Sequence, residues 1–243
     1  MAYHYPAREH RAEMVERIKS AVGVMRGCQV QLLLEAEAPV QPIRSRIDPA
    51  PSRLVGKRVA LRPPTHSDLD AFTAMFTDPE VMRFVAWGRP LTTEEVSEFV
   101  ERMIARFEVD GFGQFAIERG DDAQLIRRAG LLPLDPTTWK SGFLSDLGPD
   151  AEIELGWTLR RAYWGHGYAT EAAVLVRDWA WHELKLPRLV SIIQHGNDRS
   201  VRLAEKLGGQ RERDIVTSFG KQASLFGYRS PAASTRRSFI GHV

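Results

Sequence analysis

Residues 152–172 of the chain read EIELGWTLRRAYWGHGYATEA. The pattern predicts a strand over Glu152–Leu159 and an alanine-rich helix from Gly165 to about Glu183. A strand that enters a helix through such a turn directs free N–H groups, and the positive end of the helix, toward one point. Because Gly165 and Gly167 have no side chains, a bulky anion can approach the main chain. We therefore expect a phosphate or diphosphate site; the alternative is an ordinary tight turn.

The segments on both sides of this turn alternate between strand-like and helix-like patterns. Consecutive strands in the middle of the chain favour antiparallel pairing, whereas a helix between two strands favours a parallel crossover. We expect an α/β fold with a mixed central sheet and an exposed loop over residues 133–150. The expected strands lie at residues 59–62, 114–118, 124–132, 152–159, 189–193, 211–217 and 224–229. The expected helices begin at Thr65 or Ser67, at Thr92 or Thr93, at Gly165 and at Asn197, and the first ends near Phe76.

Residues 1–52 differ from the rest of the chain. Apolar residues at helical spacing predict an amphipathic helix over Arg8–Met25, and a short strand is expected over Gln29–Leu34. Four prolines between Ala38 and Pro51 indicate a linker. The extension is either an oligomerisation element, which would give a homodimer, or a loosely ordered or misassigned start. We expect the main domain at residues 53–230 and a tail at 231–243.

The composition excludes several classes of function. The chain has 243 residues, of which 43% are hydrophobic, and its formal net charge is +2. A charge so close to zero, without a basic run, predicts neither a nucleic-acid partner nor a membrane partner. Cys28 is the only cysteine and no HExxH motif occurs, so we expect no metal. Without a signal peptide or a long apolar stretch, we expect a cytoplasmic protein.

The string WGHGYATEA at residues 164–172 resembles the acyl-CoA-binding motif of the GNAT N-acetyltransferase superfamily, and within it the Rim-type (ribosomal-protein-alanine) branch. Three further segments resemble that family in the same order. They are RLVGKRVALRP at 53–63, TDPEVM at 77–82 and NDRSVRLAEKLG at 197–208. The resemblance covers residues 53–230. It implies a GNAT fold, in which a mixed, mostly antiparallel sheet splays at the acyl-CoA site and has helices on both faces.

The resemblance also implies that acetyl-CoA is the co-substrate. The main chain of three residues would pair with its pantetheine arm, and the turn that follows would hold its diphosphate. The first set is Trp157, Thr158 and Leu159, and the second is Trp164, Gly165, His166, Gly167, Tyr168, Ala169 and Thr170. Where the superfamily often has Gln or Arg, this chain has Ala162. Arg160 and Arg161 can supply the missing positive charge, although both also suit a solvated surface.

Glu154 is the first candidate for the base that accepts the proton of the substrate amine. A carboxylate inside a central strand is costly unless it lines a cleft or is paired, and Glu152 shares its face. The alternative for both is an exposed strand face with ion pairs. Asn197 would order the site or cap its helix, and Ser200 would contact or protonate the sulfur. Ser200 takes this role because Ala204 stands where many relatives have a tyrosine.

The acceptor stays open between several classes. The Rim-type resemblance favours a primary α-amine at a protein N-terminus, and a small-molecule amine is the other choice; Trp87 and Trp139 are expected to face it. An aminoglycoside or polyamine would need a strongly acidic cleft. Such a cleft would draw on Asp146, Asp150, Glu94, Glu95, Glu98 and Glu101. The alternative outside catalysis is a non-catalytic acyl-CoA-binding or regulatory module.

Overall fold

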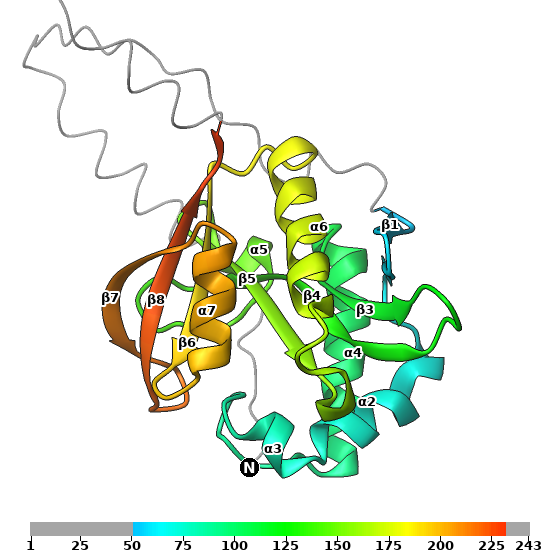
Figure 1. Cartoon of the computed structure of the whole chain (residues 1–243). Coiled ribbons are helices and arrows are strands. Elements are labelled where there is room, and N and C mark those ends of the chain that lie inside the picture. The colour runs from blue at the N-terminus through cyan, green and yellow to red at the C-terminus, as the bar shows by residue number, and fades with distance from the viewer. Residues whose placement is uncertain (1–50, 232–243) are drawn as a thin grey trace, which may run out of the picture. The chain divides into compact units, whose positions relative to one another are not determined.

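The computed structural model describes residues 51–231, so the helix and strand expected within residues 8–34 and the tail lie outside the described residues. One eight-stranded sheet organises this part of the chain, in the order β1-β2-β3-β4-β5-β6-β8-β7 (Figure 1). The strands are β1 (Leu54–Val55), β2 (Val59–Arg62), β3 (Gln114–Arg119), β4 (Leu125–Leu134), β5 (Glu152–Leu159), β6 (Arg188–Gln194), β7 (Gln210–Val216) and β8 (Gln222–Arg229).

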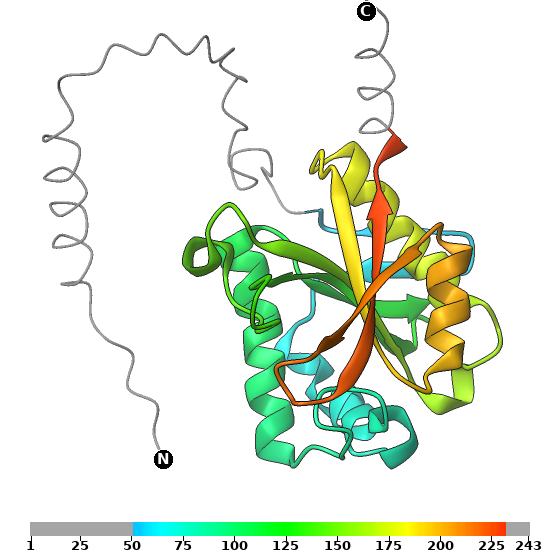
Figure 2. The same ribbon diagram turned by 90° about the vertical axis from the view of Figure 1, so that its left-hand side faces the viewer.

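Helices cover both faces of the sheet. They are α2 (Leu69–Phe76), α3 (Pro79–Met82), α4 (Thr93–Asp110), α5 (Leu144–Leu147), α6 (Tyr168–His182) and α7 (Asp198–Lys206). Figure 2 shows α4 on one side of the sheet, and α6 and α7 on the other. Among residues 51–231, no helix combines the length and the apolar character that crossing a bilayer requires.

The sheet is mixed and mostly antiparallel, as the sequence predicts. Every neighbouring pair of strands is antiparallel except β5 and β6, which run parallel. These two strands share a single residue pair, Glu154 with Val190, whereas β6 pairs with β8 along its whole length. The sheet therefore opens between β5 and β6 on the carboxyl side of Glu154.

A pair of hydroxyl groups fixes the point where the two strands separate. The Ser191 hydroxyl donates to the carbonyl oxygen of Leu155 at 2.6 Å, and the Tyr228 hydroxyl donates to Ser191 Oγ at 3.0 Å. Burial raises the pKa of Tyr228 to about 12, so its hydroxyl keeps the proton that it donates. Side-chain bonds thus replace the missing main-chain ladder at this point.

Helix α4 forms the wall of the sheet's other face. Thr92 caps it: the Thr92 side chain accepts from Glu95 N–H, and the Glu95 carboxylate accepts from Thr92 N–H. The helix ends at Gly111, whose φ of 77° lies in the left-handed region. Its apolar stripe is buried, and Phe99 packs edge-on against Phe76 of α2 with ring centroids 4.8 Å apart.

The structure corrects several boundaries. Helix α6 begins at Tyr168 rather than Gly165, because positive φ angles at Gly165 and Gly167 prevent the helix from extending further back. The expected loop at 133–150 contains the end of β4 and the short helix α5. Asp78, expected only to break the preceding helix, also caps α3 by accepting from Glu80 N–H.

Candidate active site

Glu154 lies where β5 and β6 separate. Its Oε1 atom accepts a hydrogen bond from the Ile192 amide at 3.4 Å, a donor that the open sheet leaves without a strand partner. Burial raises the pKa of the Glu154 carboxyl, and the Ile192 amide and the positive charge of Arg128 oppose this shift. A carboxylate with a raised pKa is a stronger base than an exposed one.

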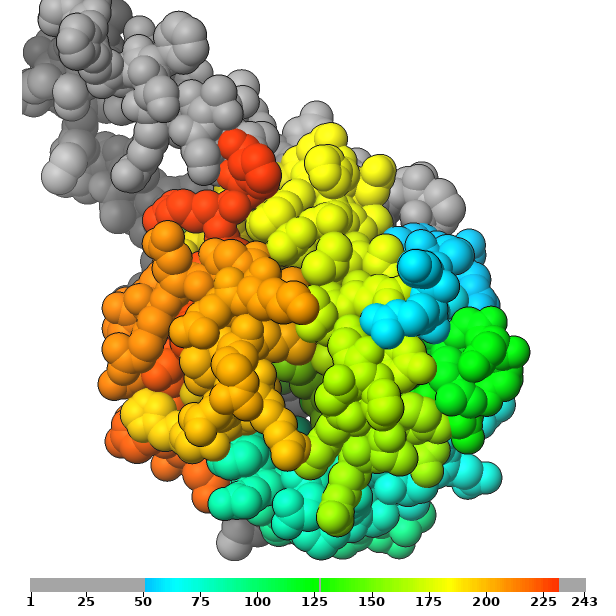
Figure 3. Space-filling model, viewed as in Figure 1, coloured from blue at the N-terminus to red at the C-terminus, as the bar shows by residue number. Residues whose placement is uncertain are grey.

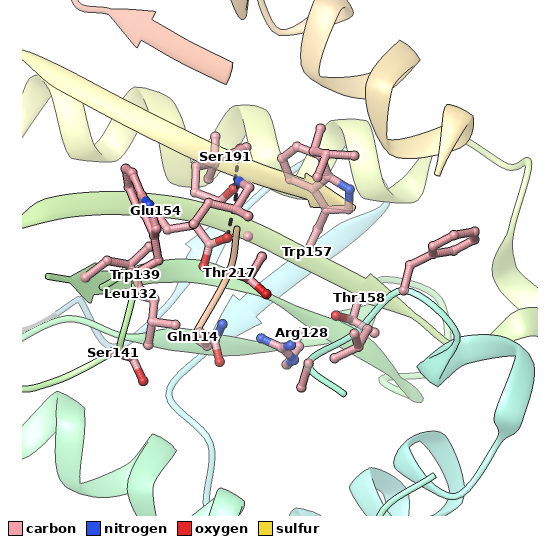
Figure 4. A pocket seen from close by; sticks show the side chains of 18 of the residues that line it. Gln114, Arg128, Leu132, Trp139, Ser141, Glu154, Trp157, Thr158, Ser191 and Thr217 are labelled. Atoms are coloured by element: carbon pink, nitrogen blue, oxygen red, sulfur yellow. Dashed lines mark hydrogen bonds between the residues drawn. The ribbon is translucent and has the colours of Figure 1, made fainter. Parts of the chain in front are cut away.

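The side chains of alternate β5 residues line one pocket. Glu154, Gly156 and Thr158 share the face that lines it, Leu155 and Trp157 also border it, and the side chains of Ile153 and Leu155 are buried in the apolar core. The pocket has a volume of about 270 Å³ and draws its walls from α4, β3, β4, β6, the start of α7 and the β7–β8 loop. Figure 4 shows Glu154, Gln114 and Arg128 directed into it from three different strands.

The main chain of β5 presents alternate residues to the opening. Leu155 carbonyl bonds to Ser191 on the β6 side, so the polar groups of Trp157 and Leu159 point to that same edge. The main chain of Thr158 points to β4 instead, and the Leu159 carbonyl accepts from Trp164 Nε1 at 2.9 Å. Of the three residues expected to pair with pantetheine, Trp157 and the Leu159 N–H border the opening; the expectation for Thr158 does not fit this geometry.

Asn197 and Ser200 lie across the opening from β5. Asn197 caps α7, because its Oδ1 atom accepts from the Ser200 amide at 3.3 Å. Trp157 Nε1 donates to Ser200 Oγ at 3.3 Å, which leaves the Ser200 hydroxyl proton available to another acceptor. Ala204, in contrast, is fully buried in the core beneath α7. The structure therefore brings Ser200, and not position 204, to the opening.

The glycine turn is held in an open conformation. Gly165 and Gly167 have φ angles of 81° and 79°, and a Cβ atom added at Gly165 would meet nothing within 4 Å. Arg58 Nη1 donates to the His166 carbonyl at 2.9 Å. Because a trans peptide directs its C=O and N–H in opposite directions, the Gly167 amide points away from Arg58. The turn thus presents free main-chain donors near the amino end of α6.

Arg58 is anchored by the first turn of α6. Its main-chain N–H donates to Glu171 Oε1 at 2.6 Å, and its Nε donates to Glu171 Oε2 at 2.9 Å. Burial of Glu171 opposes ionisation, yet the hydrogen bonds from Arg58 hold the pKa of this carboxyl below its usual value. The Arg58 guanidinium also lies 5.0 Å from the ring centre of Tyr168. The segment RLVGKRVALRP drew attention as a strand, and nothing in its pattern distinguished Arg58.

Figure 3 shows a hollow between α7, in amber, and the yellow-green segment that leads into α6. Across it, the Arg199 guanidinium lies 4.6 Å from the ring centre of Trp164. Arg160 and Arg161 lie elsewhere, around a hollow that they share with Met75 and Val81 of α2 and α3. The positive charge beside the turn therefore comes from Arg58 and Arg199, which sequence reasoning did not select.

The remaining candidates lie in different places relative to the pocket. Glu152 is paired with Arg188 at 3.1 Å, so the ion-pair alternative holds for this residue. Trp139 is only 7% exposed and lines the pocket, whereas Trp87 is 51% exposed and packs against Phe219. Within residues 51–231, no group of three or more His, Cys, Asp or Glu side chains is placed to hold a metal ion.

Arg128 lines the pocket and was missed by sequence reasoning. It is 8% exposed, and its guanidinium lies beside the pair of rings formed by Phe76 and Phe99, 5.6 and 5.2 Å from their centres. A signal was present: an arginine inside the strand-like run Gln124–Leu132 should line a cleft, by the same reasoning that selected Glu154.

Proteins similar to this chain include acetyltransferases of known structure. The family described as "Acetyltransferase (GNAT) domain" matches residues 58–210. "Uncharacterized N-acetyltransferase p20" of Bacillus licheniformis is 25% identical over 177 residues, 71% of this chain and 92% of that protein. An acetyltransferase from Agrobacterium tumefaciens is 28% identical, with a TM-score of 0.60 over 75% of this chain and 97% of that one. RimL, a ribosomal L7/L12 α-N-protein acetyltransferase solved with coenzyme A, shares the fold at 14% identity and a TM-score of 0.57, covering 74% and 99% of the two chains.

Proposed function

The chain belongs to the GNAT acetyltransferase family, and we propose that it transfers the acetyl group of acetyl-CoA to a primary amine held in the pocket beside Glu154. The observation that carries this proposal is the position of Glu154: a half-buried carboxylate with a raised pKa, at the opening of the sheet and inside the pocket. Such a group can take a proton from an ammonium ion and leave a nucleophilic amine.

In the proposed reaction the amine attacks the acetyl-CoA thioester directly. Glu154 first accepts a proton from the ammonium group. The neutral nitrogen then forms a C–N bond to the thioester carbonyl carbon, the C–S bond breaks, and the coenzyme leaves as a thiolate. The nitrogen loses its second proton, and the thiolate gains one. Ser200, whose hydroxyl proton is free to be donated, would hydrogen-bond to the departing sulfur.

The turn and the open edge of β5 support the proposed binding mode for acetyl-CoA. The exposed residues Gly165, His166 and Gly167 precede α6, so the diphosphate would meet main-chain donors and the positive helix end. The main-chain groups of Trp157 and the N–H of Leu159 suit a pantetheine arm that lies between β5 and α7 as an added strand does. The thioester would then lie near the end of this arm, close to Glu154 and Ser200.

The pocket gives no support to an aminoglycoside or polyamine acceptor. Glu154 is the one carboxylate among the described residues that line it, and Arg102, Arg106 and Arg128 line it too. The helix acids that might have formed an acidic cleft are engaged elsewhere: Glu95 pairs with Arg89, Glu98 with Arg102 and Glu101 with His66. A polycation would therefore meet a single carboxylate, with the unpaired Arg128 guanidinium in the same pocket. A protein N-terminal amine or a small-molecule amine remains the proposed acceptor.

A thiol-release assay with acetyl-CoA tests this function. Peptides with different N-terminal residues and a panel of small amines serve as acceptors, and acetyl-CoA without acceptor is the blank. We expect release that depends on the acceptor and an acetylated product of matching mass. If calorimetry shows that acetyl-CoA binds while no amine in the panel is acetylated, the non-catalytic acyl-CoA-binding module replaces the enzyme as the proposed function.

A further inference from the structure

Arg128 is a buried cation that no described residue neutralises directly. Its guanidinium forms no hydrogen bond and no ion pair with the described residues, and its Nε atom is buried without a partner. Burial lowers the pKa of Arg128 to about 10, and the charge of Glu154 only partly offsets this effect. An unpaired buried charge normally destabilises a fold. An unpaired buried arginine that lines a pocket is typical of a ligand-binding side chain.

The other arginines of the pocket differ from Arg128 in this respect. Arg106 donates to the Gly142 carbonyl and lies 3.7 Å from Asp110. Arg102 lies 3.6 Å from Glu98, on the exposed side of α4. Each of these guanidinium groups therefore has a partner within the protein. The Arg128 guanidinium has two aromatic rings beside it and also lines the pocket. A hydrogen-bonding partner for it must therefore enter from the pocket.

The position of Arg128 relative to Glu154 defines the kind of molecule that fits. Arg128 on β4 is the cross-strand partner of Thr158, and Glu154 lies four residues before Thr158 on the same face of β5. Each charge influences the pKa of the other, but they do not form an ion pair. Between them lies Gly156, where an added Cβ atom would be 3.7 Å from Gln114 Nε2. The side chain of Gln114 thus lies over the glycine that separates the base from the cation on this face of the sheet.

We infer that Arg128 binds a carboxylate carried by the acceptor, so that the substrate class is an amine with a carboxylate on the same molecule. This inference rests on the proposed function and adds the second contact to it. The amino group would lie at Glu154 and the carboxylate at the Arg128 guanidinium, which can form two parallel hydrogen bonds to it. The carboxylate supplies the counter-charge that the protein lacks at this position, and the pocket discriminates against acceptors that carry a second cation.

A series of ω-amino acids, from glycine to aminohexanoate, tests the inference against diamines and alkylamines of matched length. For the wild-type chain we expect kcat/KM for the best amino acid to exceed that of the matched diamine by about tenfold or more, because a site built for a charged group rejects analogues that lack it. In Arg128→Met, whose apolar side chain can still pack against the two phenylalanine rings, we expect this preference to fall to about onefold. The optimum chain length reports the distance between the two contacts.

Two further measurements make the result independent of catalysis and of folding. Calorimetry with the N-acetylated ω-amino acids, in the presence of coenzyme A, should show binding to the wild type and about tenfold weaker binding to Arg128→Met. Removal of an unpaired buried charge should not lower the melting temperature of Arg128→Met. Arg53→Met is the control, because Arg53 is paired with Glu118 and does not line the pocket. It should keep the preference of the wild type.

The outcomes separate the two proposals. Acetylation of amines without a carboxylate preference, together with equal product binding by the wild type and Arg128→Met, overturns the assignment of Arg128 and leaves the proposed function standing. Absence of thiol release from every amine counts against the proposed function. In that case weaker binding of the N-acetylated compounds by Arg128→Met still supports the carboxylate site, and equal or absent binding rejects it.

Discussion

The indole nitrogen of Trp157 lies 3.3 Å from the Oγ atom of Ser200, so that a strand and a helix on opposite sides of the open sheet are connected by one hydrogen bond. An indole N–H can only donate, and Ser200 Oγ is therefore the acceptor. The same serine is fixed from behind, because its main-chain N–H donates to the Asn197 side chain at 3.3 Å. These two bonds orient the hydroxyl and leave its proton for a third atom, which in our proposal is the coenzyme sulfur.

Replacement of Ser200 tests that role. We expect Ser200→Ala to lower kcat by about tenfold to a hundredfold, since a single positioned proton donor contributes on that order, while the KM for acetyl-CoA changes little. Ser200→Thr keeps a hydroxyl group and is the matched variant; it should retain most of the activity. Steady-state kinetics with saturating acceptor measures both. Equal kcat values for the wild type and Ser200→Ala would remove Ser200 from the mechanism.

The pH dependence of kcat/KM reports on Glu154. The proposed base must be ionised, so activity should fall as the pH drops through the pKa of Glu154, which burial has raised. We expect Glu154→Gln to lower kcat by about a hundredfold or more, with an unchanged dissociation constant for acetyl-CoA. In Arg128→Met the positive charge that lowers this pKa is gone, so the acid limb should move to higher pH. An acid limb at the same pH in all three proteins would exclude Glu154 as the base.

Charge at the glycine turn should control coenzyme binding. Asn and Asp have nearly the same shape, and both tolerate the left-handed backbone conformation that Gly165 adopts. We expect Gly165→Asp to bind acetyl-CoA about tenfold or more weakly than Gly165→Asn, because only the former places a negative charge beside the diphosphate. Calorimetry measures both constants, and the melting temperatures show whether the two folds are equally stable. If the two variants bind equally, the diphosphate does not lie at this turn.

Arg58 should affect the binding of acetyl-CoA by fixing the main-chain conformation of the glycine turn. Loss of its hydrogen bond to the His166 carbonyl would free the peptide to rotate, and the Gly167 amide would no longer be held outward. We expect Arg58→Gln to raise the KM for acetyl-CoA by about tenfold at most, and to leave kcat nearly unchanged. Arg53→Gln is a matched control: Arg53 is similarly exposed and pairs with Glu118, away from the turn. A similar KM for both variants would argue against this role.

The sequence predicted the elements whose patterns are local. Strand β5 has the expected limits, and α4 begins where the sequence predicted a helix start, at Thr92 or Thr93. The start of α6 was misplaced, because a repeating alanine pattern does not reveal that Gly167 has a left-handed conformation. Arg58 contacts a turn 108 residues away, and the sheet brings Glu154 and Arg128 to one pocket from separate strands. Contacts of this kind depend on strand register, which one sequence does not specify.

The single residue pair between β5 and β6 has a consequence for the handling of this protein. Across that gap a few side-chain hydrogen bonds stand where a continuous main-chain ladder would otherwise join the strands. The two parts of the sheet are therefore coupled less strongly than they would be by an intact ladder. Acetyl-CoA that binds across the gap should stabilise the folded state. A free concentration of acetyl-CoA a hundredfold above its Kd adds about 2.7 kcal/mol to the free energy of unfolding. Thermal denaturation and proteolytic resistance should then track how much coenzyme a preparation retains, and dialysed samples should be the first to lose structure.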